Sequence, residues 1–356
     1  VKERRVRERG VTNIVDSIDD QPGIWVEKRT SHTSDPVIRG LSGANLLALI
    51  DGNTLSTFWG EGGFAGDDMY GKINPDNIER IEVVRGPGSV LYGSNALGAV
   101  INFITRESPF DYTPCGTRWG GRAYAQVNTA AEGWRGHVEG YGASPRLRWI
   151  AGVTWMDYGG TRDGSGQWQS PTDATGGFAD VAINWKISEI AYAKVTVQYT
   201  HLDPVYRYYR PTQENENTRI AVAGTLEFVD LERRVGFADN ARLTLYYQDK
   251  QDERRWFDAA TGALEREGIA KWKTVQIDLQ ADKQLGCHDL TYGIEFEGTD
   301  GESPDDEQFT ITYPDGTKVK DAPDSLWASI GGYVQDVWKV NHWLTLTASA
   351  RFDMFY

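Results

Sequence analysis

The stretch NPDNIERIEVVRGPGSVLYGSNALGAVINFITR, residues 74–106, decides the fold of this 356-residue chain. Within residues 78–84, the β-forming side chains Ile78, Ile81, Val83 and Val84 predict a short β-strand. The sequence Arg-Gly-Pro-Gly at 85–88 ends this strand in a turn, because proline fixes φ and the glycines permit positive φ. A second turn of small residues, 93–98, leads into the apolar run 100–104, which predicts another strand. The stretch is therefore a compact α/β element and not a long helix.

A glycine-rich phosphate loop is the alternative interpretation of the same stretch. Its glycines stand at Gly86, Gly88, Gly93 and Gly98, and this spacing does not make G-x-G-x-x-G. No G-K-[ST] sequence follows them. The spacing therefore argues against a nucleotide site.

The order of motifs in this part of the chain resembles the plug domain of TonB-dependent outer-membrane receptors. The motifs that carry the resemblance are IERIEVVRGP at 78–87, LYGSNALGAVIN at 91–102, VIRG at 37–40 and LIDG at 49–52 (the family's IRG and DG motifs), and PGI at 22–24 (its PGV turn). At position 99 this chain has Ala where the family more often has Gly. Alanine is small enough that this departure puts nothing in doubt.

The resemblance implies an α+β plug domain inside a transmembrane antiparallel β-barrel. We assign residues 1–115 to the plug domain and 116–356 to the N-terminal part of the barrel, because Pro109, Pro114 and Gly116 mark a linker. Barrels that hold a plug have roughly 22 strands, so only about half of the barrel is expected in this chain. We expect the sequence to be a truncated receptor.

The first 50 residues predict short elements before the deciding stretch. Apolar residues at i, i+3, i+4 and i+7 within 10–19 predict a short amphipathic helix, which the sequence Gln-Pro-Gly at 21–23 ends. Short strands with turns between them are predicted at 24–26 and over 37–50. The plug is thus expected to mix helix and strand.

After the linker, side chains alternate with a period of two almost everywhere. About eleven runs are long enough for a tilted strand to cross a bilayer, which takes about ten residues. The clearest are 190–200, 241–248, 272–282 and 343–355. Short connections near residues 145, 189, 235, 285 and 341 alternate with long polar ones at 159–177, 202–217, 251–270 and 299–325, with one short exception at 130–133. This alternation predicts short periplasmic turns and long outer loops.

Composition agrees with such a barrel. The 37 basic and 51 acidic residues give a net charge of −14, which argues against nucleic acid as a partner. No run of 18 apolar residues predicts a membrane-spanning helix. The 13 Trp and 17 Tyr residues suit the aromatic girdles of a barrel in contact with outer-membrane lipid. The chain opens without a signal peptide, and we do not expect Cys115 and Cys287 to form a disulfide.

A loop rich in glycine and aromatic residues, 52–71, is the predicted ligand contact. Exposed aromatic side chains give contact area at low entropic cost, and acidic side chains stand beside them. The predicted substrate-binding residues are Phe58, Trp59, Glu61, Phe64, Asp67, Asp68 and Tyr70. The alternative is that these aromatic residues pack against the barrel wall.

Two arginines at the family's IRG and RGP positions, Arg39 and Arg85, are predicted to anchor the plug to barrel carboxylates, with Glu82 nearby. Pairs of this kind fix position more than they add stability. The candidate lumen-facing carboxylates are Glu139, Glu227, Asp278, Glu295 and Asp353. The alternative is that both arginines are solvated.

The resemblance also implies a function. Such a receptor binds a scarce nutrient, first a ferric siderophore and next haem or cobalamin, in the outer membrane of a Gram-negative bacterium. Uptake is driven by the TonB complex of the inner membrane, although no TonB box is visible in this chain. Oligosaccharide is a further ligand class. The alternative function is a passive porin or a surface-binding outer-membrane protein with a structural plug.

Catalysis is not expected. The five histidines are scattered, with no H-E-x-x-H, no G-x-S-x-G and no metal-binding pair of cysteines, so we predict neither a metal site nor a cofactor. His32 is the one plug histidine that could ligate haem, but a lone histidine is more often structural. The acidic stretch 300–307 could bind Ca²⁺, but a solvated charged loop is the better interpretation.

Overall fold

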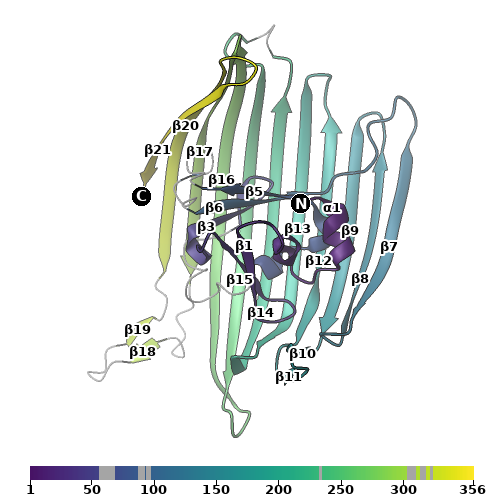
Figure 1. Cartoon of the computed structure of the whole chain (residues 1–356), viewed down its shortest axis with the longest axis vertical. Helices are drawn as coiled ribbons and strands as arrows, with labels where there is room; N and C mark the ends of the chain where they lie inside the picture. The colour runs from purple at the N-terminus through teal and green to yellow at the C-terminus, as the bar shows by residue number, and fades with distance from the viewer. Residues whose placement is uncertain are drawn as a thin grey trace.

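The computed structural model describes residues 1–55, 69–86, 93, 98–231, 235–302, 310–312, 318–320 and 324–356. A small N-terminal unit, here called the plug, lies against the concave face of a curved sheet of eleven strands, here called the wall (Figure 1). None of the helices in the described ranges is long and apolar enough to span a membrane.

The plug is built from short elements. They are α1 Glu3–Arg9, η1 Ile14–Ile18, β1 Ile24–Lys28, β2 Ser34–Ile38, η2 Gly43–Asn45, β3 Leu46–Ile50, β4 Asn53–Thr54, η5 Tyr70–Lys72, η6 Pro75–Asn77, β5 Ile78–Arg85 and β6 Ala99–Thr105. Strands β1 and β2 form a hairpin, and the other four make a sheet in the order β4-β3-β6-β5. The strands predicted at 78–84 and 100–104 are confirmed as β5 and β6.

The predicted amphipathic helix over 10–19 is wrong in length and kind. Only the 3₁₀ helix η1 forms there, and Asn13 caps it by accepting a hydrogen bond from the Val15 backbone N–H at 3.1 Å. Ile14, Val15 and Ile18 are all fully buried, so this segment enters the plug core and does not lie on its surface. The apolar residues that suggested an amphipathic helix are spaced instead by a short, buried 3₁₀ helix.

The plug has a main apolar core and a smaller buried cluster of Leu47, Leu49 and Val100 in its sheet. Ile14, Ile38, Ile101 and Phe103 have no exposed surface, and they belong to a single cluster that joins η1, the hairpin and the sheet. Burying each such side chain stabilises a fold by about 1.5–3 kcal/mol. The plug is therefore an ordinary globular unit.

The wall is an antiparallel meander in which each strand pairs with its neighbours in the chain. Its strands are β7 Arg118–Asn128, β8 Gly133–Ala143, β9 Leu147–Tyr158, β12 Ala174–Lys186, β13 Ala191–Arg207, β14 Arg210–Phe228, β15 Asn240–Phe257, β16 Leu264–Leu285, β17 His288–Glu302, β20 Ser325–Lys339 and β21 Thr345–Phe355. Two small hairpins, β10 Thr161–Arg162 with β11 Trp168–Gln169 and β18 Thr310–Thr312 with β19 Lys318–Lys320, lie in its connections. Eleven wall strands confirm the predicted number.

The wall reverses the usual placement of polar and apolar residues. Its concave face, toward the plug, carries buried polar side chains such as Asp180, Gln198 and Gln276. Its convex face carries exposed apolar side chains such as Val181 and Ile277. A sheet that faces lipid on one side and a polar lumen on the other has this pattern.

The connections differ at the two ends of the wall (Figure 1). At the end that we call the turn end, four connections are short (144–146, 187–190, 286–287, 340–344), whereas the connection 229–239, predicted to be short, is longer. The linker 106–117 also enters at this end, where the Thr113 N–H donates to Ser144 O at 3.2 Å. The opposite end, the loop end, carries β10 and β11 at the bottom of the view.

The predicted long loops at 202–217 and 251–270 are wrong. Strands β13 and β14 continue to a turn of two residues, 208–209, and β15 and β16 continue to 258–263. Cross-strand ion pairs support this extension, since Arg255 contacts Glu214 at 2.8 Å and Glu267 at 3.4 Å. Residues 210–217 and 251–255 are polar on both faces of these strands, so the sequence lacks there the apolar alternation by which strands are recognised.

Candidate ligand-binding site

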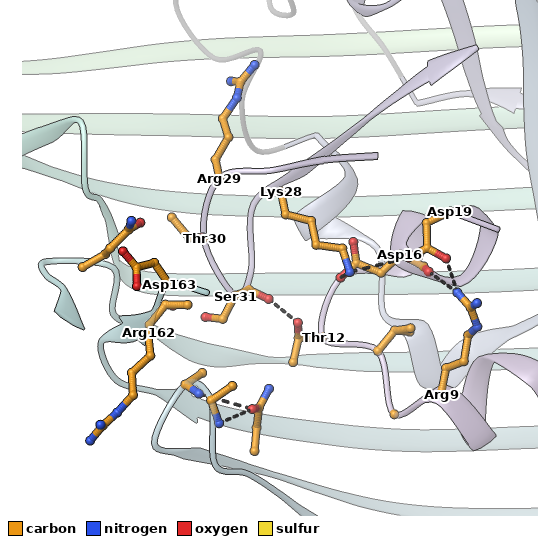
Figure 2. A pocket seen from close by; sticks show the side chains of 17 residues that line it. Arg9, Thr12, Asp16, Asp19, Lys28, Arg29, Thr30, Ser31, Arg162 and Asp163 are labelled. Atoms are coloured by element: carbon orange, nitrogen blue, oxygen red, sulfur yellow. Dashed lines mark hydrogen bonds and ion pairs between the residues drawn. The ribbon is translucent and has the colours of Figure 1, made fainter. Parts of the chain in front are cut away.

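A pocket of about 690 Å³ lies at the loop end, between the plug and the connections of the wall (Figure 2). On the plug side it is lined by the segment 9–12, by η1 and by the turn that follows β1. On the wall side it is lined by residues 128–131 and by the β10–β11 hairpin. Two parts of the chain far apart in sequence therefore form one concave site.

The turn between β1 and β2 supplies the most central plug residues. The register pairs Lys28 with Ser34, which leaves residues 29–33 to turn. The Thr33 carbonyl accepts from the N–H groups of Arg29 and Thr30 at 3.0 and 3.2 Å. Thr12 Oγ1 donates to the Ser31 carbonyl and ties the turn to the segment before η1. The turn is thus fixed from both sides.

The plug side of the pocket is dense in paired charges. Lys28 Nζ lies 3.5 Å from Asp16 Oδ2 and 3.7 Å from Asp19 Oδ2. Arg9 Nη1 donates to the Asp16 carbonyl at 2.9 Å and also contacts the Asp19 carboxylate. Burial raises the pKa of Asp16 above its ordinary value, although Lys28 opposes the shift.

The wall side adds a cation held on an aromatic ring. The Arg162 guanidinium lies 4.1 Å from the centre of the Trp168 ring and 3.4 Å from Glu132. Asp163 closes the hairpin turn by accepting from the backbone N–H groups of Ser165 and Gln167 at 2.8 and 2.9 Å. These contacts give the hairpin a defined shape at the pocket's rim.

The pocket has capacity for a polar ligand. Ser31 Oγ is buried and has no hydrogen-bond partner within the described ranges, and buried polar atoms are rarely left without one. Four cationic side chains line the pocket against three carboxylates: Arg9, Lys28, Arg29 and Arg162, with Asp16, Asp19 and Asp163. Such a lining suits a ligand with hydrogen-bonding and anionic groups.

Most of the predicted ligand-contact residues lie outside the described residues: Phe58, Trp59, Glu61, Phe64, Asp67 and Asp68. Tyr70 is described, and it is a core residue, 3% exposed and edge-on to Phe103 with ring centroids 6.1 Å apart. The turn at 29–33 was not predicted from the sequence. Its signal was a polar run between two short apolar strands.

The predicted anchors differ from those in the structure. Arg39 and Arg85 are exposed, and neither pairs with a carboxylate within the described part of the chain. Glu82 pairs inside the plug with Arg80, at 2.7 Å. Arg39 lies in the turn after β2 with a φ of 52°, so it is part of a tight turn and not an anchor to the wall.

Other residues hold the plug to the wall. Arg106 forms a two-pronged ion pair with Glu139, one of the five predicted carboxylates. Asn74 and Asn77 donate to the two oxygens of Asp180, at 2.6 and 2.8 Å. Two of the other predicted carboxylates, Glu295 and Asp353, pair instead with the wall's own Arg351, Asp278 lies beside Tyr333, and Glu227 is exposed.

The histidines are placed as structural groups. His32 is 1% exposed and sits against Gly71, so closely that a methyl group there would overlap its ring. His137 contacts Thr154 at 2.8 Å and Glu139 at 3.0 Å. The residues 303–309 of the predicted calcium-binding stretch lie outside the described ranges.

A small domain seated by polar contacts against the polar face of a lipid-facing sheet defines a plug-and-barrel membrane protein. Comparison with known proteins agrees. Residues 1–100 match the family model "TonB-dependent Receptor Plug Domain". The N-terminal part of this chain, residues 1–100, is therefore a plug domain of the TonB-dependent receptor type.

Individual relatives are similar in sequence or in fold. A hemin receptor of Yersinia pestis is 25% identical over 289 residues, which are 79% of this chain and 41% of the relative. The vitamin B12 transporter BtuB of Vibrio vulnificus is 33% identical over 110 residues, 30% of this chain and 17% of the relative.

Solved structures match the fold over the whole chain. The copper transporter OprC superposes with a TM-score of 0.79 at 15% identity, and this chain covers 54% of it. The siderophore receptor PirA of Acinetobacter baumannii gives 0.76 at 17% identity, with 56% of it covered. The chain thus spans about half the length of the proteins it matches.

Proposed function

We propose that this chain belongs to a receptor of the Gram-negative outer membrane that takes up a scarce nutrient, with energy supplied by the TonB complex. It is a receptor and not an enzyme. A ferric siderophore is the first candidate ligand, and haem and cobalamin follow. The named ligands of relatives support this range, since they include hemin, vitamin B12 and a siderophore. We keep 1–115 as the plug domain and 116–356 as the barrel part.

The observation that carries the proposal is how the plug is attached. Its bonds to the wall are polar, whereas its own core is apolar. A typical hydrogen bond adds only about 0.5–1.5 kcal/mol net, because water replaces it when it breaks. An attachment of this kind holds a plug in place and still lets it separate from the wall without exposing apolar surface.

The pocket at the loop end supports the same proposal. It lies on the side opposite the linker, where the wall's connections and the plug's β1–β2 turn meet (Figure 2). A ligand bound there is separated from the turn end by the plug itself. Displacement of the plug is then required for passage, which is what an energised receptor supplies.

The test is uptake by cells that carry the full-length receptor. Ferric enterobactin, haemin and cyanocobalamin are supplied in turn, with binding and uptake measured separately. We expect one of them to bind, and its uptake to stop when a protonophore removes the proton gradient while binding persists. Uptake that continues without the gradient would favour the alternative, a passive porin with a structural plug.

A second test addresses the pocket. We expect Lys28→Ala combined with Arg162→Ala to weaken binding of the ligand identified above by about tenfold, because two charge-assisted contacts are lost. Arg118→Ala, at the turn end, is the matched control and should bind as the wild type does. Equal affinity in all three proteins would place the ligand elsewhere.

A further inference from the structure

We propose that the ligand passes the plug along one seam, between the plug sheet and wall strands β14–β17, and that contacts of Thr54 with Gln276 and Glu297 form the latch of that seam. This inference rests on the proposed transport function. It adds which side of the plug opens, and it follows from how contacts are distributed around the plug.

Wall strands β7–β13 hold the plug through many buried contacts along its length. Arg106 pairs with Glu139 on β8, and Asn74 and Asn77 bind Asp180 on β12. Further contacts on this side join wall side chains to plug backbone carbonyls: Arg135 to Val11 at 2.8 Å, Gln126 to Gly10 at 2.6 Å, Arg148 to Ser108 at 2.9 Å and Thr200 to Lys72 at 2.9 Å. We call β7–β13 the fastened side.

Toward the loop end, the side formed by β14–β17 also holds the plug, through the buried ion pair of Lys72 with Asp252 on β15. Toward the turn end this side is different. A cavity of about 570 Å³ separates the plug sheet from the wall there. The wall side chains that line it bond to one another: Arg242 to Gln280 at 3.0 Å, Thr225 to Thr244 at 3.4 Å and Tyr333 to Asp278 at 3.4 Å. Because these bonds lie within the wall, they persist when the plug moves.

The lining of this cavity keeps it hydrated. Six carboxylates line it against two cations, and the cation Lys194 already pairs with the plug residues Asp51 and Glu107, at 3.5 and 3.1 Å. Of the other four carboxylates, Glu82 pairs with Arg80 of the plug and Glu295 with Arg351 of the wall, which leaves Glu227 and Asp278 with the second cation of the lining, Arg242. Charged groups in such number require water around them.

The latch closes this cavity toward the loop end. The Thr54 N–H donates to Gln276 Oε1 at 2.8 Å, and the Thr54 hydroxyl donates to Glu297 at 3.0 Å. Gln276 Nε2 donates back to Thr54 Oγ1 at 2.8 Å and to Glu297 at 2.7 Å. All three residues are buried.

Thr54 belongs to β4, which has two residues and lies at the edge of the plug sheet. Among the described strands, only β3 pairs with it, through Leu49 and Ile50. Release of one short edge strand opens the loop-end rim of the cavity and leaves the fastened side intact. The seam therefore opens with a small rearrangement of the plug, in which the Lys72–Asp252 pair beyond the latch also separates.

The experiment compares two cross-links in full-length receptor with Cys115→Ser and Cys287→Ser, since both native thiols are exposed. One variant carries Thr54→Cys and Gln276→Cys across the latch, and the other carries Asn77→Cys and Asp180→Cys on the fastened side. A short bis-maleimide joins each pair. Binding and gradient-dependent uptake of the ligand are measured before and after cross-linking.

We expect the latch cross-link to reduce uptake at least tenfold while binding is retained, and the fastened-side cross-link to leave at least half of the uptake. Equal blockage by both cross-links, or blockage by the fastened-side link alone, would overturn the inference. If the latch variant does not bind ligand before cross-linking, Asn53→Cys with Thr244→Cys, which line the same cavity, replaces it. If uptake by the wild-type receptor does not depend on the proton gradient, the proposed energised transport is refuted instead.

Discussion

The plug and the wall bury opposite kinds of side chain. Ile101 in the plug sheet is completely buried, whereas Ile277 in the wall is 41% exposed, and its neighbour Gln276 is only 4% exposed. The plug follows the rule for proteins surrounded by water, and the wall follows the rule for a sheet between lipid and a polar lumen. The difference teaches that exposure depends on the solvent that a face meets.

The largest expected effect tests the apolar core of the plug. Phe103→Ala should destabilise the plug by about 3–5 kcal/mol, since it removes a fully buried ring and leaves a cavity. Hydrogen exchange of plug amides in the full-length protein measures the loss. Val84→Ala, at a position 41% exposed on the same sheet, is the control and should change stability by less than about 0.5 kcal/mol.

The second effect tests whether the convex face of the wall meets lipid. Ile277→Arg, within the apolar band between Val275 and Leu279, should cost about 2–4 kcal/mol, because a charge is placed in hydrocarbon. Reversible unfolding from lipid vesicles measures it. Thr225→Arg, which faces the hydrated cavity, should cost less than about 1 kcal/mol, and similar losses for both would contradict the assignment of the two faces.

The third effect tests the polar contacts by which the wall holds the plug. Arg106→Ala should weaken plug attachment by about 1–3 kcal/mol, since Glu139 loses one charged partner and keeps Arg122 at 3.2 Å and His137 at 3.0 Å. Protease sensitivity of the plug reports the change. Arg85→Ala should leave that sensitivity unaltered, and a large effect there would restore the anchor role expected from sequence.

The smallest effect concerns pH. The raised pKa of Asp16 means that the folded plug binds this proton more tightly than the unfolded chain does. Its contribution is full below the unfolded pKa of about 3.9 and is lost as pH rises through the folded pKa. The stability of Asp16→Asn relative to wild type should therefore increase with pH above about 4. A difference that stays flat between pH 4 and 7.5 in urea unfolding would contradict this.

Local patterns predicted much of the fold. The runs at 78–84 and 100–104 became strands as expected, because their turns are fixed by glycine and proline. Period-two alternation gave the number of wall strands. It failed within residues 202–217, because 210–217 are polar on both faces and cross-strand partners such as Arg255 and Glu214 define the strand there.

The site was less predictable, because its contacts join residues far apart in the chain. Arg106 and Glu139 are ordinary charged residues in sequence, and only the seating of the plug brings them together. The turn at 29–33 faces a hairpin that follows 130 residues later. Motif matching located the plug, but it named Arg39 and Arg85, which lie exposed.

Strand β16 has 22 residues, about twice the ten or so that a bilayer requires. At about 3.4 Å per residue it is roughly 75 Å long, so even when tilted by about 40° it extends well beyond a hydrocarbon layer of about 30 Å. Strands β13–β16 thus continue as a β-sheet rim beyond the hydrocarbon layer at the loop end. An antibody that recognises this rim should require its folded shape and should fail to bind the corresponding linear peptide.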